Sequence, residues 1–328
     1  MRVLVTGGAG FVGSRLVERL AEGGTLVDVL DDLSTGSARN LEAVQRYGRV
    51  SLVRGDVRDR VLVGDLVREA DAVFHLAGAV GVRRVAEDPV DTWSRNVEGT
   101  ASVLAACARL GTRCLVASTS EVYGTRATGV LAEDAAVAVE PTARRDVYAV
   151  SKMAGESLAL AMHRASLLPV TVVRLFNVVG PRQSERYGMV LPRFARAAVR
   201  GEPLPVHGDG RQSRCFLHVD DATRALAQLA STPAAEGLVV NVGSDEEVEV
   251  GELARRVVAE AGTDAPIRCV PFADVYGEGF VDPPRRRPDL SRLVALTGFA
   301  RARSLADAIA GAVAHARAGL DPVAPTPR

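Results

Sequence analysis

The chain has 328 residues, of which 47% are apolar and 24% are charged, so it can bury a large core and is not a disordered protein. Its 40 basic and 40 acidic residues balance to a formal net charge of +0. This balance excludes a global attraction to nucleic acid or to an anionic membrane, so any anion site has to be built locally. No apolar stretch approaches the roughly 20 residues that cross a bilayer, and no signal peptide follows Met1, so we expect a cytoplasmic protein.

Short apolar runs alternate with helical patterns over the first 175 residues. The expected strands are 3–6, 26–30, 50–53, 72–76, 114–117 and 170–174, and the expected helices are 12–22, 37–47, 59–69, 90–110 and 146–166. The runs are apolar on both sides of the pleat, as in parallel strands that helices cover on both faces. The sequence therefore predicts an α/β fold, with a Rossmann-like, doubly wound parallel sheet.

The texture of the sequence changes after about residue 180. Glycine and proline become denser, the apolar runs shorten, and helical patterns recur at 188–200, 219–231, 249–262 and 304–317. This part is expected to form a smaller C-terminal α/β lobe on the carboxyl edge of the sheet. We predict a first domain at 1–178, a lobe at 179–318 that is interleaved with it, and a disordered tail at 319–328.

Rare residue types carry information in this chain. Of the 40 basic residues 39 are arginine, and Lys152 is the single lysine, a bias that is typical of a GC-rich genome. A lysine that remains where arginine is the default is expected to do something that arginine cannot. The four cysteines form no Cys-x-x-Cys pair and are expected to be reduced thiols, mostly in the core. The five histidines lack ligand spacing, so no metal is expected, and His75 is expected to be a packed, hydrogen-bonded residue.

A glycine-rich turn lies between the first expected strand and the first expected helix. Gly7, Gly10 and Gly13 recur at spacings that permit a tight turn, close approach of the backbone to a pyrophosphate and tight packing of helix on strand. A merely structural turn is the alternative, but the position between strand and helix favours a dinucleotide site.

Carboxylates follow the second and third expected strands. Asp31 stands where a carboxylate binds the adenosine ribose hydroxyls and repels a 2′-phosphate, which favours NAD over NADP. A solvated turn residue is the alternative, since Asp32 is beside it. Asp56 could contact the adenine amino group.

Tyr148 and Lys152 are four residues apart and would share one face of a helix. An ammonium group beside a phenol stabilises the phenolate, so we expect a lowered pKa for Tyr148. A pair on a solvated helix face is the alternative, and the scarcity of lysine argues against it. The segment 118–124 directly follows the fifth expected strand and is expected to face the same ligand crevice.

The chain resembles the extended short-chain dehydrogenases/reductases, a family of NAD-dependent nucleotide-sugar epimerases, dehydratases and decarboxylases. The motifs that carry the resemblance are TGGAGFVG at 6–13, DDLSTG at 31–36, GDVRD at 55–59, HLAG at 75–78, NVEGT at 96–100, STSEVYG at 118–124, YAVSK at 148–152, RLFNVVGPR at 174–182 and RCFLHVDD at 214–221. The resemblance implies that the first domain binds NAD, that the second lobe binds the nucleotide sugar, and that the protein is a homodimer through the helices near 90–110 and 146–166.

The resemblance also implies residue roles. Tyr148 would take the proton from a sugar hydroxyl, Lys152 would tune it and hold the nicotinamide ribose, and Thr119 would bind the reacting oxygen. The residues expected to bind NAD are Gly7, Gly10, Phe11, Val12, Gly13, Asp31, Asp32, Ser34, Gly36, Asp56, Val57, Leu76, Ala77, Gly78, Asn96, Ser118, Tyr148, Lys152 and Phe176. Those expected to bind substrate are Ser120, Asn177, Arg182, Arg214 and Arg286, with Asn177 and Arg214 on the diphosphate.

The type of reaction depends on the residues after Thr119. Sugar 4,6-dehydratases carry an aspartic acid where this chain has Ser120, and a serine hydroxyl is a poor acid for expelling water. The string STSEVYG is similar to that of UDP-glucuronate decarboxylases, and so are the distant strings YGEGF at 276–280 and RRRPD at 285–289. The resemblance implies that Glu121 and Arg286 are further catalytic residues, with Arg286 matched within three consecutive arginines. NDP-glucuronate decarboxylation is the best specific prediction. A 4-epimerase, a 4,6-dehydratase and, remotely, a non-catalytic NAD-sensing protein remain the alternatives.

Overall fold

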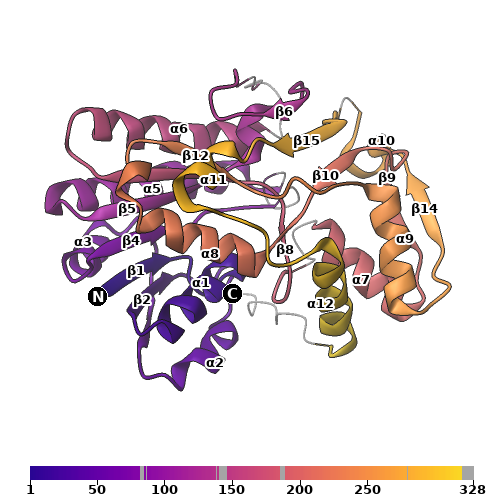
Figure 1. The fold of residues 1–328 in the computed structure, drawn as a ribbon, viewed down its shortest axis with the longest axis horizontal. Helices are drawn as coiled ribbons and strands as arrows, with labels where there is room; N and C mark the ends of the chain where they lie inside the picture. Colours follow the sequence, from indigo (N-terminus) through magenta and orange to yellow (C-terminus); the bar gives the residue numbers. More distant parts are fainter. Residues whose placement is uncertain are drawn as a thin grey trace.

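The computed structural model describes residues 1–81, 85, 87–137, 139, 146–184, 189–278 and 280–319. Almost all of the expected tail at 319–328, and the first residue of the helix expected at 188–200, lie outside these residues. Figure 1 shows the large sheet with its covering helices on one side of the molecule and a smaller helical lobe on the other.

The large sheet has seven parallel strands in the order β12-β7-β5-β4-β1-β2-β3. Their bounds are β1 Arg2–Thr6, β2 Leu26–Asp31, β3 Val50–Arg54, β4 Ala72–His75, β5 Arg113–Thr119, β7 Val170–Leu175 and β12 Val239–Val242. The doubly wound α/β fold is confirmed. β12 was not expected from the sequence, because its run of four residues is too short to stand out in the Gly- and Pro-rich half.

Helices cover both faces of this sheet, as the apolar runs predict. One face is covered by α1 Phe11–Glu22 and α8 Val219–Ala230, and the other by α3 Arg60–Arg68, α5 Pro89–Leu110 and α6 Asp146–Arg164. Val3 and Val5 join the first core and Leu4 the second, because successive side chains of a strand point to opposite faces. The helix expected at 37–47 is instead a 3₁₀ turn, η1 Ala38–Leu41, followed by a single turn, α2 Glu42–Gln45.

The second lobe has its own apolar core between α7 Val190–Arg200, α9 Val250–Ala261 and α12 Leu305–Arg317. Its strands form a four-stranded sheet, β13 Glu247–Glu249, β10 Ser213–Cys215, β15 Arg285–Pro288 and β6 Val130–Leu131, and the pairs β11 Leu217–His218 with β8 Val178–Val179 and β14 Ile267–Val270 with β9 Leu204–His207. The remaining short elements are η2 Ser120–Tyr123, η3 Pro233–Ala235, α10 Phe272–Tyr276 and α11 Ser291–Thr297.

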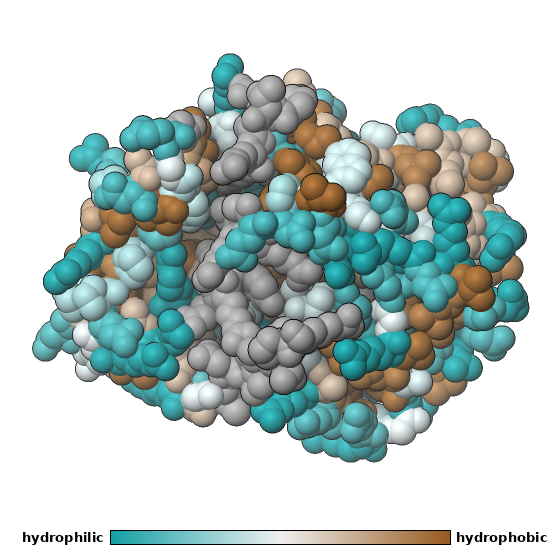
Figure 2. Space-filling view, turned by 180° about the vertical axis from the view of Figure 1, so that it is seen from behind, coloured by the Kyte–Doolittle hydropathy of each residue, from teal (hydrophilic) through white to brown (hydrophobic). Residues whose placement is uncertain are grey.

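The polar surface and the mostly buried cysteine thiols agree with what the composition predicted. Figure 2 shows polar side chains over much of the face opposite to that of Figure 1, with apolar ones in separate patches. Cys107, Cys114 and Cys215 are buried, whereas Cys269 is exposed. Within the described ranges, no helix is long and apolar enough to cross a membrane.

Candidate active site

A cavity of about 570 Å³ lies between the carboxyl ends of the large sheet and the second lobe. Its walls come from segments that are far apart in the sequence, including the glycine-rich turn, the end of β5, α6 and β15. The predicted residues that line it are Gly7, Gly10, Phe11, Val12, Gly13, Asp31, Asp32, Ser34, Asp56, Val57, Leu76, Ala77, Gly78, Ser118, Thr119, Ser120, Glu121, Tyr148, Lys152, Phe176, Asn177, Arg214 and Arg286. The fold therefore brings together most of the residues that the sequence singled out.

The glycine-rich turn forms a cradle at the start of α1. Gly7 has a φ of +72°, and a Cβ on Gly13 would lie 2.1 Å from the Gly7 carbonyl oxygen, so neither position accommodates a side chain. Gly10 is the N-cap of α1 and supplies no capping side chain, and the first turn of the helix has no acidic residue. The first N–H groups of α1 and the positive end of its dipole therefore suit a pyrophosphate, which is what NAD would place here.

The carboxylate of Asp31 closes one end of this cradle. It accepts hydrogen bonds from the backbone N–H groups of Ala9 (2.9 Å) and Leu33 (2.8 Å) and is buried. Burial raises the pKa of Asp31, and these two hydrogen bonds oppose the rise. The turn after β2 is therefore built around this side chain, and its remaining lone pairs can accept from ribose hydroxyls.

An ion-pair network surrounds the same end of the cavity. Arg95 of α5 pairs with Asp32 and, at 2.6 Å, with Asp91, while Arg58 pairs with Asp56 at 2.6 Å. The Arg58 guanidinium lowers the pKa of the Asp56 carboxyl. Arg95 lines the cavity but was not predicted as a site residue, because nothing in the sequence separates it from 38 other arginines.

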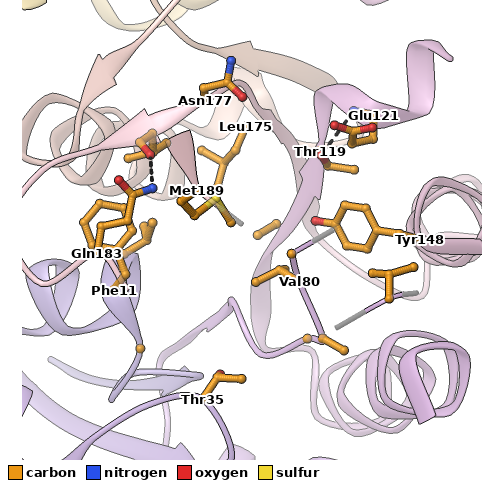
Figure 3. A pocket seen from close by; sticks show the side chains of 18 of the residues that line it. Phe11, Thr35, Val80, Thr119, Glu121, Tyr148, Leu175, Asn177, Gln183 and Met189 are labelled. Atoms are coloured by element: carbon orange, nitrogen blue, oxygen red, sulfur yellow. Dashed lines mark hydrogen bonds between the residues drawn. The ribbon is translucent and has the colours of Figure 1, made fainter. Parts of the chain in front are cut away.

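Tyr148 and Lys152 lie on α6 one turn apart, as predicted, and both line the cavity. In Figure 3 the hydroxyl of Tyr148 points into the cavity near Thr119, and the Thr119 hydroxyl is its hydrogen-bond partner. Lys152 donates to the Ala117 carbonyl oxygen at 3.0 Å, and a Cβ on Gly78 would lie 3.1 Å from its Nζ. The glycine therefore leaves room for the ammonium group.

The pKa of Tyr148 does not follow the expectation. Burial raises it, the hydrogen bond from Thr119 lowers it less, and the negative charge of Glu121 raises it further. Desolvation of the phenolate is the largest of these influences, so the pKa of Tyr148 lies above its ordinary value and the predicted lowering is wrong. Burial also lowers the pKa of Lys152, to about 8.

Glu121 and Arg286 meet across the cavity, although 165 residues separate them. Arg286 Nη1 donates to Glu121 Oε1 at 2.5 Å. Glu121 belongs to η2, which directly follows β5, and the Thr119 hydroxyl caps it by accepting from the Glu121 N–H (Figure 3). Arg286 is 4% exposed, and its Nη2 is buried with no hydrogen-bond partner among the described residues. Arg286 lines the cavity and has an unsatisfied buried donor, so its guanidinium suits an anion bound there.

The register of the three consecutive arginines is set by β15. Arg286 lines the cavity, whereas Arg285 points to the other face of the strand and pairs with Glu247 at 2.6 Å. Strand alternation accounts for this difference, since neighbours in a strand point to opposite faces.

The second lobe supplies the far end of the cavity. Arg214 is held by Asp282 at 2.5 Å and by the Ser213 carbonyl oxygen at 2.7 Å, and Asn177 lies beside the end of β7 (Figure 3). Lining residues that the sequence analysis missed are Gln183, Arg193, His207, Gln212, Phe272, Tyr276, Phe280 and Asp282. Tyr276 and Phe280 belong to the 276–280 string and Arg193 to α7, but none was predicted as a site residue. The others come from loops and short elements, for which the Gly- and Pro-rich texture was the available signal.

Three predicted binding residues do not line the cavity. Asn96 is buried, and its amide accepts from the Ala79 N–H at 2.8 Å and donates to the Ser151 hydroxyl at 2.9 Å. It therefore supports the cavity wall from behind. Arg182 pairs with Glu18 at 3.2 Å. A Cβ on Gly36 would lie 2.9 Å from the Ala9 carbonyl carbon, so this glycine serves close backbone packing.

His75 is hydrogen-bonded and buried, as expected. Its ring nitrogens contact the hydroxyls of Thr6 (2.8 Å) and Thr100 (3.0 Å). Burial lowers the pKa of His75 to about 3, so the imidazole is neutral at physiological pH.

A doubly wound sheet, a glycine cradle at the first helix and a Tyr-x-x-x-Lys pair facing that cradle define an NAD-dependent enzyme of the short-chain dehydrogenase/reductase type. Residues 3–243 match the NAD dependent epimerase/dehydratase family, and the chain belongs to this family. The resemblance expected from the motifs is thereby confirmed.

Curated relatives include decarboxylases of nucleotide-linked uronic acids. The chain is 37% identical over 300 residues to the UDP-N-acetyl-alpha-D-glucosaminuronate decarboxylase of Bacillus cytotoxicus, covering 91% of this chain and 92% of that protein. It is 34% identical over 298 residues to UDP-glucuronic acid decarboxylase 1 of Xenopus tropicalis, covering 91% of this chain and 68% of that protein.

Solved structures of other reaction types share the fold. The dTDP-glucose 4,6-dehydratase of Streptomyces venezuelae with NAD bound superposes with a TM-score of 0.87 at 31% identity, covering 97% of each chain. The UDP-glucuronic acid 4-epimerase of Bacillus cereus, in complex with UDP-glucuronic acid and NAD, superposes with a TM-score of 0.87 at 26% identity, covering 97% of this chain and 99% of that one.

Proposed function

We propose that this protein is an NDP-hexuronate decarboxylase that acts through a transient 4-keto sugar. The observation that carries the proposal is Arg286, whose buried Nη2 has no partner in the described part of the chain and whose Nη1 is paired with Glu121 inside the cavity. A substrate carboxylate would satisfy this donor. A neutral hexose would leave it unpaired, which costs free energy in a buried site.

NAD, when bound at the glycine cradle, supplies hydride acceptance from C4 of the sugar and hydride return. Tyr148 is placed to take the proton of the C4 hydroxyl. Thr119 would donate a hydrogen bond to the C4 oxygen, whose charge changes during hydride transfer. Lys152 carries a fixed positive charge beside this pair. Because its pKa is near 8, Lys152 stays protonated at neutral pH and stabilises the phenolate as it forms.

The second half of the reaction needs a different pair. A 4-keto uronate is a β-keto acid, so the C5–C6 bond can break with its electron pair delocalised onto the ketone, CO₂ leaves, and a proton is added at C5. Arg286 can hold the carboxylate out of the ring plane. Glu121 places a negative charge near that carboxylate, and loss of CO₂ relieves the repulsion.

Two observations separate this proposal from its alternatives. Ser120 lies in the cavity wall where a dehydratase needs an acid to protonate a leaving hydroxyl, and a serine hydroxyl does not serve. A 4-epimerase of neutral hexoses needs Tyr148 but brings no carboxylate to Arg286. A 4-epimerase of uronates brings the same carboxylate, and the labelled substrate below distinguishes it from a decarboxylase. The decarboxylases among the relatives support the same choice.

The deciding experiment uses UDP-glucuronate labelled at C6, with UDP-N-acetylglucosaminuronate and the dTDP analogue as further substrates. We expect label to leave as CO₂ and a UDP-pentose to form. Arg286→Gln and Glu121→Gln are expected to lower kcat by about 10² or more, with 4-keto product and NADH accumulating. If no label leaves while the 4-epimer appears, the epimerase replaces this proposal.

We also propose the organisation of the working enzyme. The region 1–178 would bind NAD, 179–318 would bind the nucleotide sugar, and the protein would act in the cytoplasm as a homodimer through α5 and α6. Val90 and Trp93 support the dimer, because α5 exposes these large apolar side chains by 77% and 42%. Light scattering at micromolar concentration is expected to give twice the chain mass, and a stable monomer would contradict the dimer.

A further inference from the structure

A charged cluster lies behind the cavity, in a layer that the reaction itself does not use. Glu156 is on α6, one helical turn after Lys152, and is 3% exposed. Its carboxylate accepts from Arg174 Nη2 at 2.8 Å and from Arg174 Nε at 3.1 Å. It also accepts a hydrogen bond from the hydroxyl of Ser118. Glu156 is thus tied to three elements at once, which are α6, β7 and the end of β5.

Arg174 is fixed on its other sides as well. Its Nη1 donates to the Glu133 carbonyl oxygen at 3.2 Å, and its guanidinium lies 4.8 Å from the ring centroid of Tyr123. A buried ion pair is weak evidence for stability, because removing both charges from water costs about as much as their attraction returns. A role in the site explains better why the chain buries a carboxylate here.

The role follows from the effect of the Glu156 charge on Lys152. The charge of Lys152 interacts with His75 of β4 and with Glu156 of α6, and Glu156 is paired in turn with Arg174 of β7. Tyr148 lies one turn before Lys152 on α6. His75 and Tyr148 are neutral at pH 7 because burial disfavours their charged forms. Burial lowers the pKa of Lys152, and the negative charge of Glu156 opposes that effect.

We propose that Glu156 is a positioning residue of this active site, which keeps Lys152 protonated and holds Ser118, and with it the Thr119–Glu121 segment, against α6. It acts through Lys152 and Ser118 and does not line the cavity. Arg174 orients the carboxylate and neutralises part of its charge. The proposal rests on the role given above to Lys152, but its central measurement needs no substrate and no turnover.

The composition of this chain permits a direct test. Lys152 is its single lysine, so protein labelled with ¹³C at the lysine ε-carbon gives one lysine resonance, whose titration reports the pKa of Lys152. With NAD at saturation in every sample, we expect Glu156→Gln to lower this pKa by about 1 unit, since a charge one turn away acts through a poorly screened interior. An unchanged titration midpoint, within about 0.3 units, would overturn the proposal.

Matched variants separate the charge from the fold. Ser118→Ala removes the hydrogen bond to Glu156 but no charge, so the midpoint is expected to stay within about 0.3 units of the unmodified protein. Glu156→Gln leaves Arg174 unpaired, so Glu156→Gln/Arg174→Met restores a neutral cluster if the single variant does not fold. The double variant also removes the positive charge of Arg174, so its midpoint is expected to lie between those of Glu156→Gln and of the unmodified protein, whatever its thermal stability. A loss of stability without a shift of the midpoint would show a merely structural role for Glu156.

Discussion

Burying the ammonium group of Lys152 costs the protein stability, and replacing Lys152 with methionine is expected to recover it. Lys152 is 7% exposed, and burial lowers its pKa from 10.5 to about 8. That difference corresponds to about 3 kcal/mol of destabilisation at pH 7, because each pKa unit is worth about 1.4 kcal/mol. Methionine has a similar length and no charge.

The net gain is smaller than this cost. Lys152→Met leaves the Ala117 carbonyl oxygen without its 3.0 Å donor, which costs about 1 kcal/mol. We therefore expect the free energy of unfolding at pH 7 to rise by about 2 kcal/mol, and Tm by roughly 4 °C. The same variant is expected to lose turnover, so this lysine exchanges stability for function.

Urea unfolding of NAD-free protein at several pH values tests this reasoning. The folded-state pKa is the lower one, so between pH 8 and about 10.5 the unfolded chain holds a proton that the folded protein has released. The stability of the unmodified protein then rises with pH relative to that of the variant, and the advantage of Lys152→Met shrinks toward pH 10. A variant that is less stable at pH 7, or a difference that does not change with pH, would refute the argument.

Three further outcomes are expected. Asp31→Ala narrows the preference for NAD over NADP, because the carboxylate repels a 2′-phosphate; calorimetric binding of both cofactors measures this, and tighter intrinsic binding of NADP to the unmodified protein would contradict it. Tyr148→Phe abolishes turnover while NAD binding stays nearly intact, as fluorescence titration can check. Lys152→Arg is nearly as damaging as Tyr148→Phe, because Gly78 leaves room for an ammonium but not for a planar guanidinium; retention of most activity would remove this explanation.

The sequence predicted the large sheet well because its strands are buried on both faces. Such strands are continuous apolar runs. Because they are parallel, the segments at their carboxyl ends, which are the glycine turn, Asp31 and the Thr119 segment, lie at the same edge of the sheet. β12 was not predicted because it joins the sheet from a region of the chain whose hydrophobic patterns are weak. Its partner in the ladder, β7, lies more than 60 residues earlier in the chain, and no local spacing encodes that pairing.

Contacts between residues far apart in the sequence complete the site, and they could not be predicted because no local spacing encodes them. Arg286 was named from a motif, but its contact with Glu121 depends on the tertiary placement of β15. The pKa of Tyr148 was expected to fall, since helical spacing reveals the neighbouring lysine but not the depth of burial. Desolvation is a property of the assembled cavity that local sequence does not show, and it is the largest influence on this pKa.

The pairing of β10 with β15 determines which of the three consecutive arginines lines the cavity. These strands are parallel neighbours with Arg214 opposite Arg286, so the two Cα atoms are about 5 Å apart. On the other face, Glu247 of β13 binds both Arg285 and Ser213 and so holds the register. A slip by one residue would turn Arg286 out of the cavity and bring Arg285 or Arg287 in. In the proposed mechanism the first half-reaction depends on α6 and the second on this separate sheet, which would let enzymes that share the Tyr-Lys pair differ in how the 4-keto sugar reacts next.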